Sequence, residues 1–593
     1  MEQSNEELQL RIRELEKEIA KLHTQIKKER YGLVWLDVPE GFERESENQI
    51  PVLEEVKDKA IKNDDGKPTH IIIEGDNYHA LTCLNYTHKG KIDVIYIDPP
   101  YNTGSDGFTY KDKRFLKEFP DGSPVPKDHP LRHSYWLSFM SKRLELAKNL
   151  LSDKGVIFIS IDDNEQANCK LLCDKIFGES NFVSCIVITS NSSKNNAICV
   201  SVNTEYLLVY ANNLLYHNTK WLVKKNYVDD YNTTAKRLLQ SGMSDDEIQN
   251  ELRQLTRYPK FYDFDHYTYV DKKGPFQASD LTAPSSKNFY DIIHPITHKS
   301  CAKGRRGWAF SEEKMKVLLE EGRILFGENE DVMPRLKNYL CDNEYQLLKS
   351  SLFFDSQSST KWMKDNGFDF PFPKSIEYIK YILSSFPQKS SIILDFFAGS
   401  GTTLHATMKL NAEDGGNRQC ILVQQKEGDK NICESVTYER NKRVINGYTN
   451  AKGEQIPGLG NSLKYYRTAF VGKNPPRRAT DYDKTELSKK AGCLLALAEN
   501  TLEEIEASNS FQIFSDGKNH YTGVYFTGRL TEIETFTQKL EDIRNQNRRI
   551  KITAYFFCWG DCAQFEDEFT NLERISLQPI PKPILDIYQS INR

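Results

Sequence analysis

The stretch that decides the fold is residues 91–110, KIDVIYIDPPYNTGSDGFTY. It begins with an apolar run rich in β-branched residues, and that run ends at Asp98-Pro99-Pro100-Tyr101. A short apolar run that stops at a breaker is typical of a buried strand in a parallel sheet. Adjacent prolines lack N–H groups and restrict the residue before them, so strand pairing must end there. We therefore expect an aspartate at the carboxyl end of a strand, where open α/β sheets bind ligands.

This tetrapeptide carries groups that can hold an amino group on a planar base. The Asp98 carboxylate can accept one hydrogen bond from such a group, and the Pro99 carbonyl can accept a second. The ring of Tyr101 offers a face on which a base can stack. Together they would aim the nitrogen lone pair at an electrophile, which is catalysis by positioning. Taken alone, the four residues fit an ordinary strand-to-turn junction equally well.

A second apolar strand leads into a glycine-containing turn at residues 391–405, SIILDFFAGSGTTLH. The strand ends at Asp395, and Gly399 and Gly401 precede a predicted helix. Glycines in such a turn let the backbone approach a ligand closely, and the start of a helix favours negative charge. The dinucleotide fingerprint is not met, because Leu404 stands where its third glycine belongs. Taken alone, Gly-x-Gly is therefore a weak signal.

Together, DPPYNTG at residues 98–104 and DFFAGSGTT at residues 395–403 resemble the motifs of amino-group DNA methyltransferases that use S-adenosylmethionine. In this family the order of the motifs defines the class. Here the catalytic motif comes first, a long insert follows and the cofactor loop comes late, which resembles the β class. Within that class the chain from Tyr31 onward is most similar to the modification subunit of type III restriction-modification systems.

The resemblance implies an α/β fold with a doubly wound, mostly parallel sheet, a permuted motif order, an inserted DNA-recognition domain and an α+β C-terminal domain. It also implies direct methyl transfer to a base swung out of the duplex, whose amino group cannot be reached in the stack. The family tends to place Asp before Pro-Pro for adenine N6 and Ser for cytosine N4, so Asp98 favours adenine. No Pro-Cys pair occurs, which argues against cytosine C5 methylation.

The resemblance also assigns residues to the cofactor. Asp395 would lie near its methionine part, while Phe397, Gly399 and Gly401 would border it. Glu427 follows the next predicted strand, where a nucleoside-binding βαβ unit places a carboxylate for the ribose hydroxyls.

Two further residues are implied at the cofactor site. Asp76 would contact the adenine, although the cap of a predicted helix is an equally good interpretation of it. Lys374 would neighbour the methionine carboxylate, although Ser375 stands where the family commonly has proline. No metal is expected, because methyl transfer needs none.

Composition bounds the class of protein. At 593 residues the chain is expected to form about three domains. The net charge of −5 excludes a uniformly basic coat, so any DNA surface must be local. The 12 cysteines include no Cys-x-x-Cys pair, and no apolar segment is long enough to span a membrane, so we expect a cytoplasmic protein with reduced thiols.

Two regions of the sequence are expected to contact partners, namely a second copy of the chain and DNA. Residues 1–30 carry apolar residues at alternating spacings of four and three, which predicts a coiled-coil-like helix and a homodimer, with an amphipathic helix on its own domain as the alternative. Residues 212–355 form the expected target-recognition domain for double-stranded DNA. Its segment HPITHKSCAKGRRGW contains the candidate DNA-binding residues Lys299, Lys303, Arg305 and Arg306.

The remaining segments complete the expected organisation. The catalytic domain occupies residues 31–211 and 356–467, and residues 105–130 form a long loop near the active site. Residues 468–593 form a terminal α+β domain, in which 487–505 predicts a helix.

Three functional hypotheses remain. The first is a DNA adenine methyltransferase acting as a type III modification subunit, for which a separate ATP-dependent nuclease subunit must cleave, because the sequence has no phosphate-binding Gly-x-x-x-x-Gly-Lys motif. The second is an orphan regulatory methyltransferase. The third is a non-catalytic DNA-specificity subunit, against which the intact motifs weigh.

Overall fold

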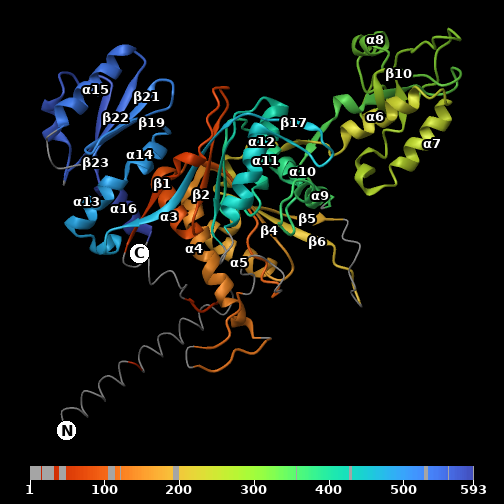
Figure 1. The fold of residues 1–593 in the computed structure, drawn as a ribbon. Helices are drawn as coiled ribbons and strands as arrows, with labels where there is room; N and C mark the ends of the chain where they lie inside the picture. The colour runs from red at the N-terminus through yellow and green to blue at the C-terminus, as the bar shows by residue number, and fades with distance from the viewer. Residues whose placement is uncertain are drawn as a thin grey trace. The chain divides into compact units, whose positions relative to one another are not determined.

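The computed structural model describes residue 15 and residues 33–38, 49–104, 114–119, 122–127, 129–190, 199–355, 357–426, 431–526, 532–558 and 560–591. The chain divides into two compact units (Figure 1). The first comprises Met1–Asn218, Ser350–Leu383 and Gln388–Arg593, and the second comprises Thr219–Lys349 and Ser384–Pro387. The helix predicted for residues 1–30 lies outside the described residues, apart from the helical Leu15.

A ten-stranded sheet forms the centre of the first unit. The strands from β18 to β4 run parallel to one another, whereas β1 and β6 are antiparallel to their neighbours. This mostly parallel sheet confirms the predicted doubly wound α/β class. Across the sheet the strands are β1 (Ile50–Glu55), β18 (Ser462–Val471), β2 (Thr69–Glu74), β15 (Gln419–Gln424), β14 (Ile392–Asp395), β3 (Ile92–Ile97), β4 (Leu151–Ile161), β6 (Thr204–Ala211), β5 (Phe182–Thr189) and β13 (Ser351–Phe353).

Helices cover both faces of this sheet (Figure 1). One layer consists of α3 (Asn77–Thr87), α4 (Ser134–Leu150) and α5 (Gln166–Phe177), and the other includes α10 (Ile376–Ser384), α11 (Thr402–Asp414) and α12 (Glu439–Asn446). The central strands are buried on both faces, which explains why they are continuous runs of isoleucine, leucine and valine rather than alternating patterns.

The direction of winding reverses between β14 and β3. From β14 the chain passes through α11 to β15 on one side, and from β3 it passes through α4 to β4 on the other. Leu394 of β14 lies opposite Ile95 of β3, so both strands end at the same edge of the sheet. Such a switch point is where open α/β sheets bind ligands.

Apart from Ser384–Pro387, the second unit lies within the expected recognition insert at residues 212–355. It contains a four-stranded antiparallel sheet, a two-stranded ribbon and small separate cores that include Phe264 and Trp308. The sheet order is β10 (Ile324–Leu325), β11 (Arg335–Tyr339), β9 (Gly274–Ser279) and β8 (Tyr269–Asp271); the ribbon pairs β7 (Leu222–Lys224) with β12 (Tyr345–Leu347); the helices are α6 (Val228–Leu239), α7 (Asp245–Leu255) and α8 (Glu312–Glu320).

The C-terminal region is built around a five-stranded sheet, as its α+β pattern predicted. The helix predicted for residues 487–505 is wrong in part, because the chain turns out of helix before β19 and pairs there with β20. The strands are β19 (Glu503–Ala507), β20 (Phe511–Ser515), β21 (His520–Tyr525), β22 (Lys551–Phe557) and β23 (Ile575–Ile580), with helices α13 (Asp481–Lys490), α14 (Gly492–Ala498), α15 (Ile533–Gln546) and α16 (Lys582–Ile591).

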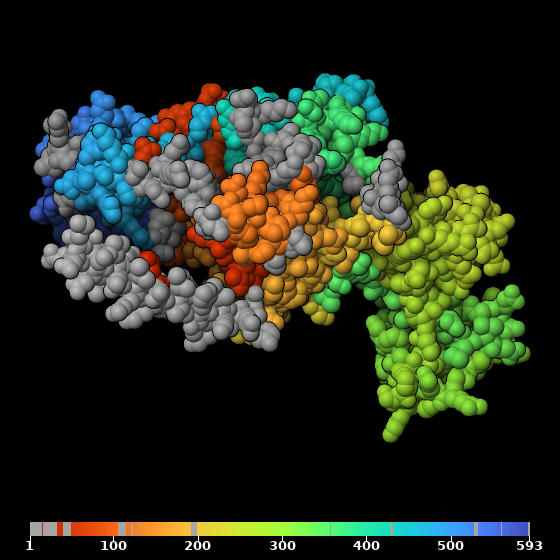
Figure 2. Space-filling view, turned by 90° about the horizontal axis from the view of Figure 1, so that it is seen from below, coloured from red at the N-terminus to blue at the C-terminus, as the bar shows by residue number. Residues whose placement is uncertain are grey.

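This region shares a core with the catalytic part of the same unit. The buried cluster that contains the ends of β2 and β3 also contains Leu495 of α14 and Tyr588 of α16. The hydroxyl of Tyr588 donates to the Pro51 carbonyl oxygen at 3.1 Å. In the space-filling view the light-blue surface that follows β18 borders the red surface of the first strands (Figure 2). The expected boundary at residue 468 falls inside β18.

Two general features accompany the fold. All twelve cysteines are free thiols, and eight of them are buried. No helix in the described part of the chain combines the length and the apolar character that crossing a bilayer needs.

The shared core leads to a stability prediction. Tyr588→Ala should lower the free energy of unfolding by about 3–5 kcal/mol, because it removes a fully buried ring and its hydrogen bond to β1. Chemical denaturation of the full chain measures this, with Ser590→Ala on the exposed side of α16 as the control. Equal stability of the two variants would contradict a core shared between β1 and α16.

Candidate active site

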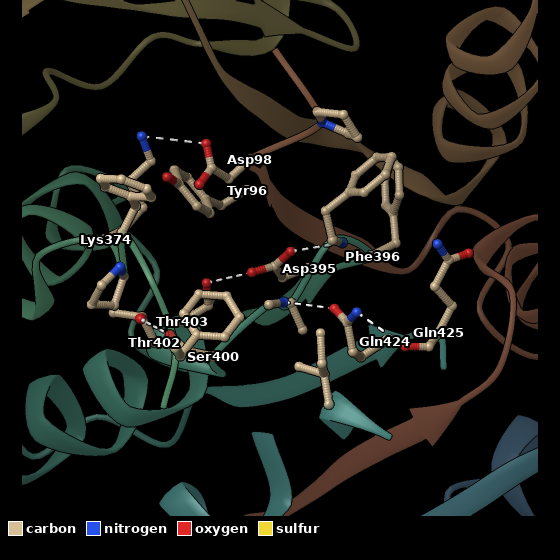
Figure 3. A pocket seen from close by; sticks show the side chains of 18 of the residues that line it. Tyr96, Asp98, Lys374, Asp395, Phe396, Ser400, Thr402, Thr403, Gln424 and Gln425 are labelled. Atoms are coloured by element: carbon tan, nitrogen blue, oxygen red, sulfur yellow. Dashed lines mark hydrogen bonds and ion pairs between the residues drawn. The ribbon is translucent and has the colours of Figure 1, made fainter. Parts of the chain in front are cut away.

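A cavity lies at the carboxyl ends of β14, β15 and β3 (Figure 3). It encloses about 930 Å³ of space, open mouth included. Asp395 enters it from the end of β14, Ser400 from the turn that follows and Thr403 from the first turn of α11, while Gln424 and Gln425 enter from the end of β15. The cavity therefore occupies the switch point of the sheet.

Asp395 is fixed within the glycine turn. Its Oδ1 accepts a hydrogen bond from the Phe397 amide at 3.0 Å, and its Oδ2 accepts one from the Thr403 hydroxyl at 2.6 Å. Burial raises the pKa of this carboxyl to about 7, although the two hydrogen bonds oppose the shift. The carboxylate thus ties the end of β14 to the first turn of α11 and sets the shape of the cavity floor.

The two glycines of the turn have different reasons to be glycine. Both have left-handed backbones, with φ of +51° at Gly399 and +74° at Gly401. A Cβ on Gly399 would lie 3.3 Å from the Phe370 ring in the cavity wall. A Cβ on Gly401 would lie 2.4 Å from the Asn441 amide nitrogen, on α12 behind the cavity. Gly399 lines the cavity, whereas Gly401 permits the close approach of α12.

The end of β15 supplies polar groups that the sequence did not single out. The Gly399 amide donates to Gln424 Oε1 at 2.7 Å, which joins the turn to the neighbouring strand. Gln425 follows it in the cavity wall. Glu427, the candidate ribose ligand, lies outside the described residues, so its role stays a prediction.

Asp76 caps α3, because its side chain accepts from the Tyr78 amide at 2.8 Å. The next residue, Asn77, lines the cavity and donates to the Phe396 carbonyl oxygen at 3.1 Å. The capping interpretation of Asp76 is therefore confirmed, and its contact with a cofactor stays a prediction.

Aromatic rings form the apolar walls. Phe397 lines the cavity with its ring 6.0 Å from that of Phe139, and Phe370 and Ile432 also line it. The guanidinium of Arg114 lies 3.6 Å from the centre of the Phe139 ring. An apolar slot with a polar floor of this kind suits a planar heterocycle linked to a polar chain.

The catalytic tetrapeptide is anchored from behind. The indole of Trp136, buried in α4, donates to the Pro100 carbonyl oxygen at 2.7 Å. Asn102 adopts a left-handed backbone with φ of 59°, and its amide donates to Glu165 at 2.6 Å. These contacts fix the chain on both sides of Tyr101.

The Asp98 carboxylate belongs to a cluster of polar side chains. Its Oδ1 accepts from the Tyr101 hydroxyl at 2.8 Å and lies 3.3 Å from the Lys374 ammonium. That ammonium donates to the Tyr101 oxygen at 2.7 Å and to Glu205 at 2.6 Å. These contacts place Lys374 beside the catalytic motif, and its contact with a cofactor carboxylate stays a prediction.

Burial and the neighbouring charges together shift the pKa values of Asp98 and Lys374. Burial raises the pKa of Asp98, and the Lys374 ammonium only partly opposes the shift. The nearby carboxylates of Asp98 and Glu205 raise the pKa of Lys374, which outweighs its burial and keeps it charged. A carboxylate with a raised pKa is a stronger hydrogen-bond acceptor and proton acceptor than an exposed one.

A second, wider cavity meets the first at Asp98. It encloses about 2310 Å³, open solvent included, and its lining contains Tyr101, Thr103 and Glu205. Asp98, Phe372, Pro373 and Lys374 line both cavities. Phe372 has a left-handed backbone with φ of 54° and is 73% exposed, a strained conformation of the kind found at functional sites.

Further behind the glycine turn lies Arg440, which the sequence also did not reveal. Its guanidinium is buried and donates to the hydroxyls of Ser400 at 2.8 Å and Thr402 at 2.7 Å. Neither Arg440 nor Glu205 belongs to a recognisable motif, so only the folded structure shows that they serve the site.

The basic segment lies in the second unit. Lys299 pairs with Glu330 at 2.8 Å and Lys303 pairs with Asp291 at 2.6 Å, whereas Arg305 and Arg306, which are exposed like the two lysines, make no such ion pair among the described residues. Because acids partly neutralise the two lysines, the arginines are the stronger candidates for phosphate contacts.

Comparisons with known proteins place these features in a family. Residues 92–450 match the family described as DNA methylase. The Mod subunit of the type III restriction-modification enzyme EcoP15I from Escherichia coli is 33% identical over 440 residues, which cover 70% of this chain and 68% of that protein. The StyLTI Mod subunit from Salmonella typhimurium is also 33% identical, over 63% of this chain and 55% of that protein.

A type II methyltransferase and a solved structure extend the comparison. M.KpnI from Klebsiella pneumoniae is 33% identical over 67% of this chain and 90% of its own length. The solved PvuII DNA methyltransferase (cytosine-N4-specific) is 10% identical, covers 66% of this chain and 98% of its own, and has a TM-score of 0.29. The chain spans about half to two thirds of the type III relatives.

The two glycines allow a test of their separate roles. Gly399→Ala should weaken the binding of S-adenosylmethionine more than Gly401→Ala, because its Cβ pushes the Phe370 ring in the cavity wall. Gly401→Ala should be the less stable of the two variants. A left-handed backbone costs alanine roughly 1–2 kcal/mol of folding free energy, and this variant should lose more than that because Asn441 must also move. Calorimetric titration and thermal unfolding measure these effects. The same losses in both variants would contradict the division.

Proposed function

Because the chain belongs to the N6/N4 family of DNA methylases, we propose that it is a sequence-specific DNA adenine-N6 methyltransferase that uses S-adenosylmethionine. The observation that carries the proposal is the meeting of Asp98 with the glycine turn after Asp395 at one edge of one sheet. Neither motif alone is specific, but together they present an amino-group acceptor beside a nucleoside-sized cavity.

The first cavity fits the cofactor. Its aromatic walls suit the adenine, and Gly399 in the turn allows close approach without a Cβ in the way. We assign the adenosine to the side of Gln424 and Gln425, with Glu427 as the proposed ribose ligand, and the methionine part to the side of Asp395. When bound, S-adenosylmethionine supplies a methyl group made electrophilic by its sulfonium sulfur.

The second cavity receives the target base. The base must leave the duplex, because its amino group is inaccessible in the stack. Asp98 and the Pro99 carbonyl would hold the two amino hydrogens, while Tyr101 would offer its ring for stacking. Since Asp98 lines both cavities, an amino group held there faces the first cavity.

The protein's own groups also account for the proton. The amino nitrogen gains a carbon substituent and must lose one proton to become a neutral secondary amine. Asp98 is the adjacent acceptor, and the raised pKa of its carboxyl suits it to this role.

Adenine is favoured over cytosine by the aspartate before the two prolines. The family includes both amino-group specificities, and the solved PvuII enzyme is cytosine-N4-specific. The proposal of adenine therefore rests on Asp98 before Pro99 and Pro100.

The assembly we propose is a type III modification subunit, as a homodimer that works with a separate restriction subunit. The identity to EcoP15I Mod supports this assignment. A second candidate is a stand-alone methyltransferase, because the match to the type II enzyme M.KpnI covers 90% of that protein. In either case the second unit would bind double-stranded DNA through Lys299, Lys303, Arg305 and Arg306, with the two arginines making the main phosphate contacts.

The catalytic role of Asp98 leads to a direct prediction. Asp98→Ala should abolish methyl transfer to DNA and leave the affinities for cofactor and DNA largely intact, because it removes the amino-group acceptor and only one of the many side chains that line the two cavities. Incorporation of radiolabelled methyl groups into unmethylated bacterial DNA measures this. Asp163→Ala, at the end of the neighbouring strand β4 and outside both cavity linings, is the control and should stay active. Full activity of Asp98→Ala would overturn the assignment.

The basic segment leads to a binding prediction. Arg305→Ala with Arg306→Ala should weaken DNA binding and reduce the slope of log affinity against log salt by about 1–2, since each lost phosphate contact lowers the slope by about 1. Fluorescence titration at several salt concentrations measures the slope.

Lys314→Ala with Lys316→Ala removes the same charge from exposed positions on α8 of the same unit, and should change neither value. Equal losses in the two double variants would move the DNA surface away from the arginines.

A further inference from the structure

Glu205 stands in the catalytic cluster although no motif contains it. It lies on β6, which is separated from β3 by β4, and its side chain is 47% exposed towards the second cavity. Its Oε2 accepts from the Lys374 ammonium at 2.6 Å, and the Tyr101 hydroxyl lies 3.3 Å from the same oxygen. The Lys374 side chain is only 18% exposed, and its ammonium has carboxylates on two sides.

The two oxygens of Asp98 are not used alike. The Tyr101 hydroxyl and the Lys374 ammonium both contact Oδ1, at 2.8 and 3.3 Å. Within the described part of the chain, no hydrogen bond to Oδ2 is present. The cluster therefore orients the carboxylate through one oxygen and leaves the other for an amino group.

The position of the Lys374 ammonium, and with it the free Oδ2 of Asp98, depends on Glu205. The Lys374 ammonium lies nearer to Glu205 than to Asp98, at 2.6 against 3.3 Å. Without the Glu205 charge, Asp98 is the carboxylate left in contact with the ammonium. An ammonium beside a half-buried carboxylate gains most by approaching both oxygens, because little water remains to screen the attraction.

We propose that Glu205 is a positioning residue of the methyl-transfer site, which holds Lys374 so that Oδ2 of Asp98 stays free for the target amino group. The inference rests on the proposed methyl transfer and adds to it a residue on a different strand. Glu205 need not touch the base, since it acts through Lys374.

The same geometry fixes the direction of a pH effect. The charged and titratable groups around Asp98 are Lys374, Glu205, Tyr101, Tyr96 and Asp395, and Tyr378 and Asp162 lie near Lys374 and Glu205. Burial raises the pKa of Asp98, Lys374 lowers it and the Glu205 charge raises it again. Removing that charge and tightening the Lys374 contact should both lower the pKa of Asp98.

The test compares Glu205→Gln, Lys374→Met and the double variant with the wild-type chain. The measurement is the single-turnover rate of methyl transfer to unmethylated bacterial DNA across pH, with cofactor and DNA affinities determined separately. Glu205→Gln should slow transfer about 10-fold with unchanged affinities, since misplacement of a reacting group costs rate rather than binding. The acid limb of its rate profile should move to lower pH, because transfer needs ionised Asp98.

The double variant should regain part of the rate that Glu205→Gln loses, because Lys374→Met removes the ammonium that blocks Oδ2 of Asp98. Asp163→Asn, an exposed carboxylate beside the same strand, is the control and should match the wild type. A wild-type rate in Glu205→Gln, or an unmoved acid limb, would overturn the inference and leave the proposed function standing. A wild-type chain that transfers no methyl group would overturn both.

Discussion

The parallel hydrogen bonding between β14 and β3 sets the position of both halves of the site. Leu394 pairs with Ile95, so Asp395 and Asp98 leave the sheet at the same edge although the recognition insert separates them in the chain. Both strands are buried on two faces, and a shift of register by one residue would turn their isoleucines and leucines to the wrong layer. The packing of the core and the geometry of the site are thus fixed by the same pairing.

At that edge, burial sets the chemistry. Asp395 is kept from water by the glycine turn, and its pKa rises to about 7. The pKa of Asp98 is raised for the same reason, with one ammonium to balance two carboxylates. Groups in such surroundings are strong hydrogen-bond partners and respond strongly to the loss of a neighbour. The placement of Lys374 is therefore as important for the site as the presence of Asp98.

Local sequence was sufficient to predict the parts of the fold that depend on local rules. The isoleucine-rich runs before Asp98 and Asp395 and their breakers predicted buried strands of a parallel sheet, and the family resemblance predicted the doubly wound α/β fold; the structure confirms both. The helix expected at residues 487–505 was wrong in part, because pairing with β20 overrides the local preference at β19. The shared core of α3, α14 and α16 could not be predicted, since contacts between distant helices leave no local pattern.

The site followed the same division. Residues in motifs, such as Asp98 and Gly399, could be named from the sequence together with the resemblance. Glu205 and Arg440 could not, because their importance comes only from the strands and helices that bring them to Lys374 and Ser400. The most direct test of the central claim is a map of methylated bases across a methylation-free bacterial genome after this chain is expressed alone. The account predicts N6-methyladenine on one strand of a short asymmetric site, whereas N4-methylcytosine, or a genome without new methylation, would contradict it.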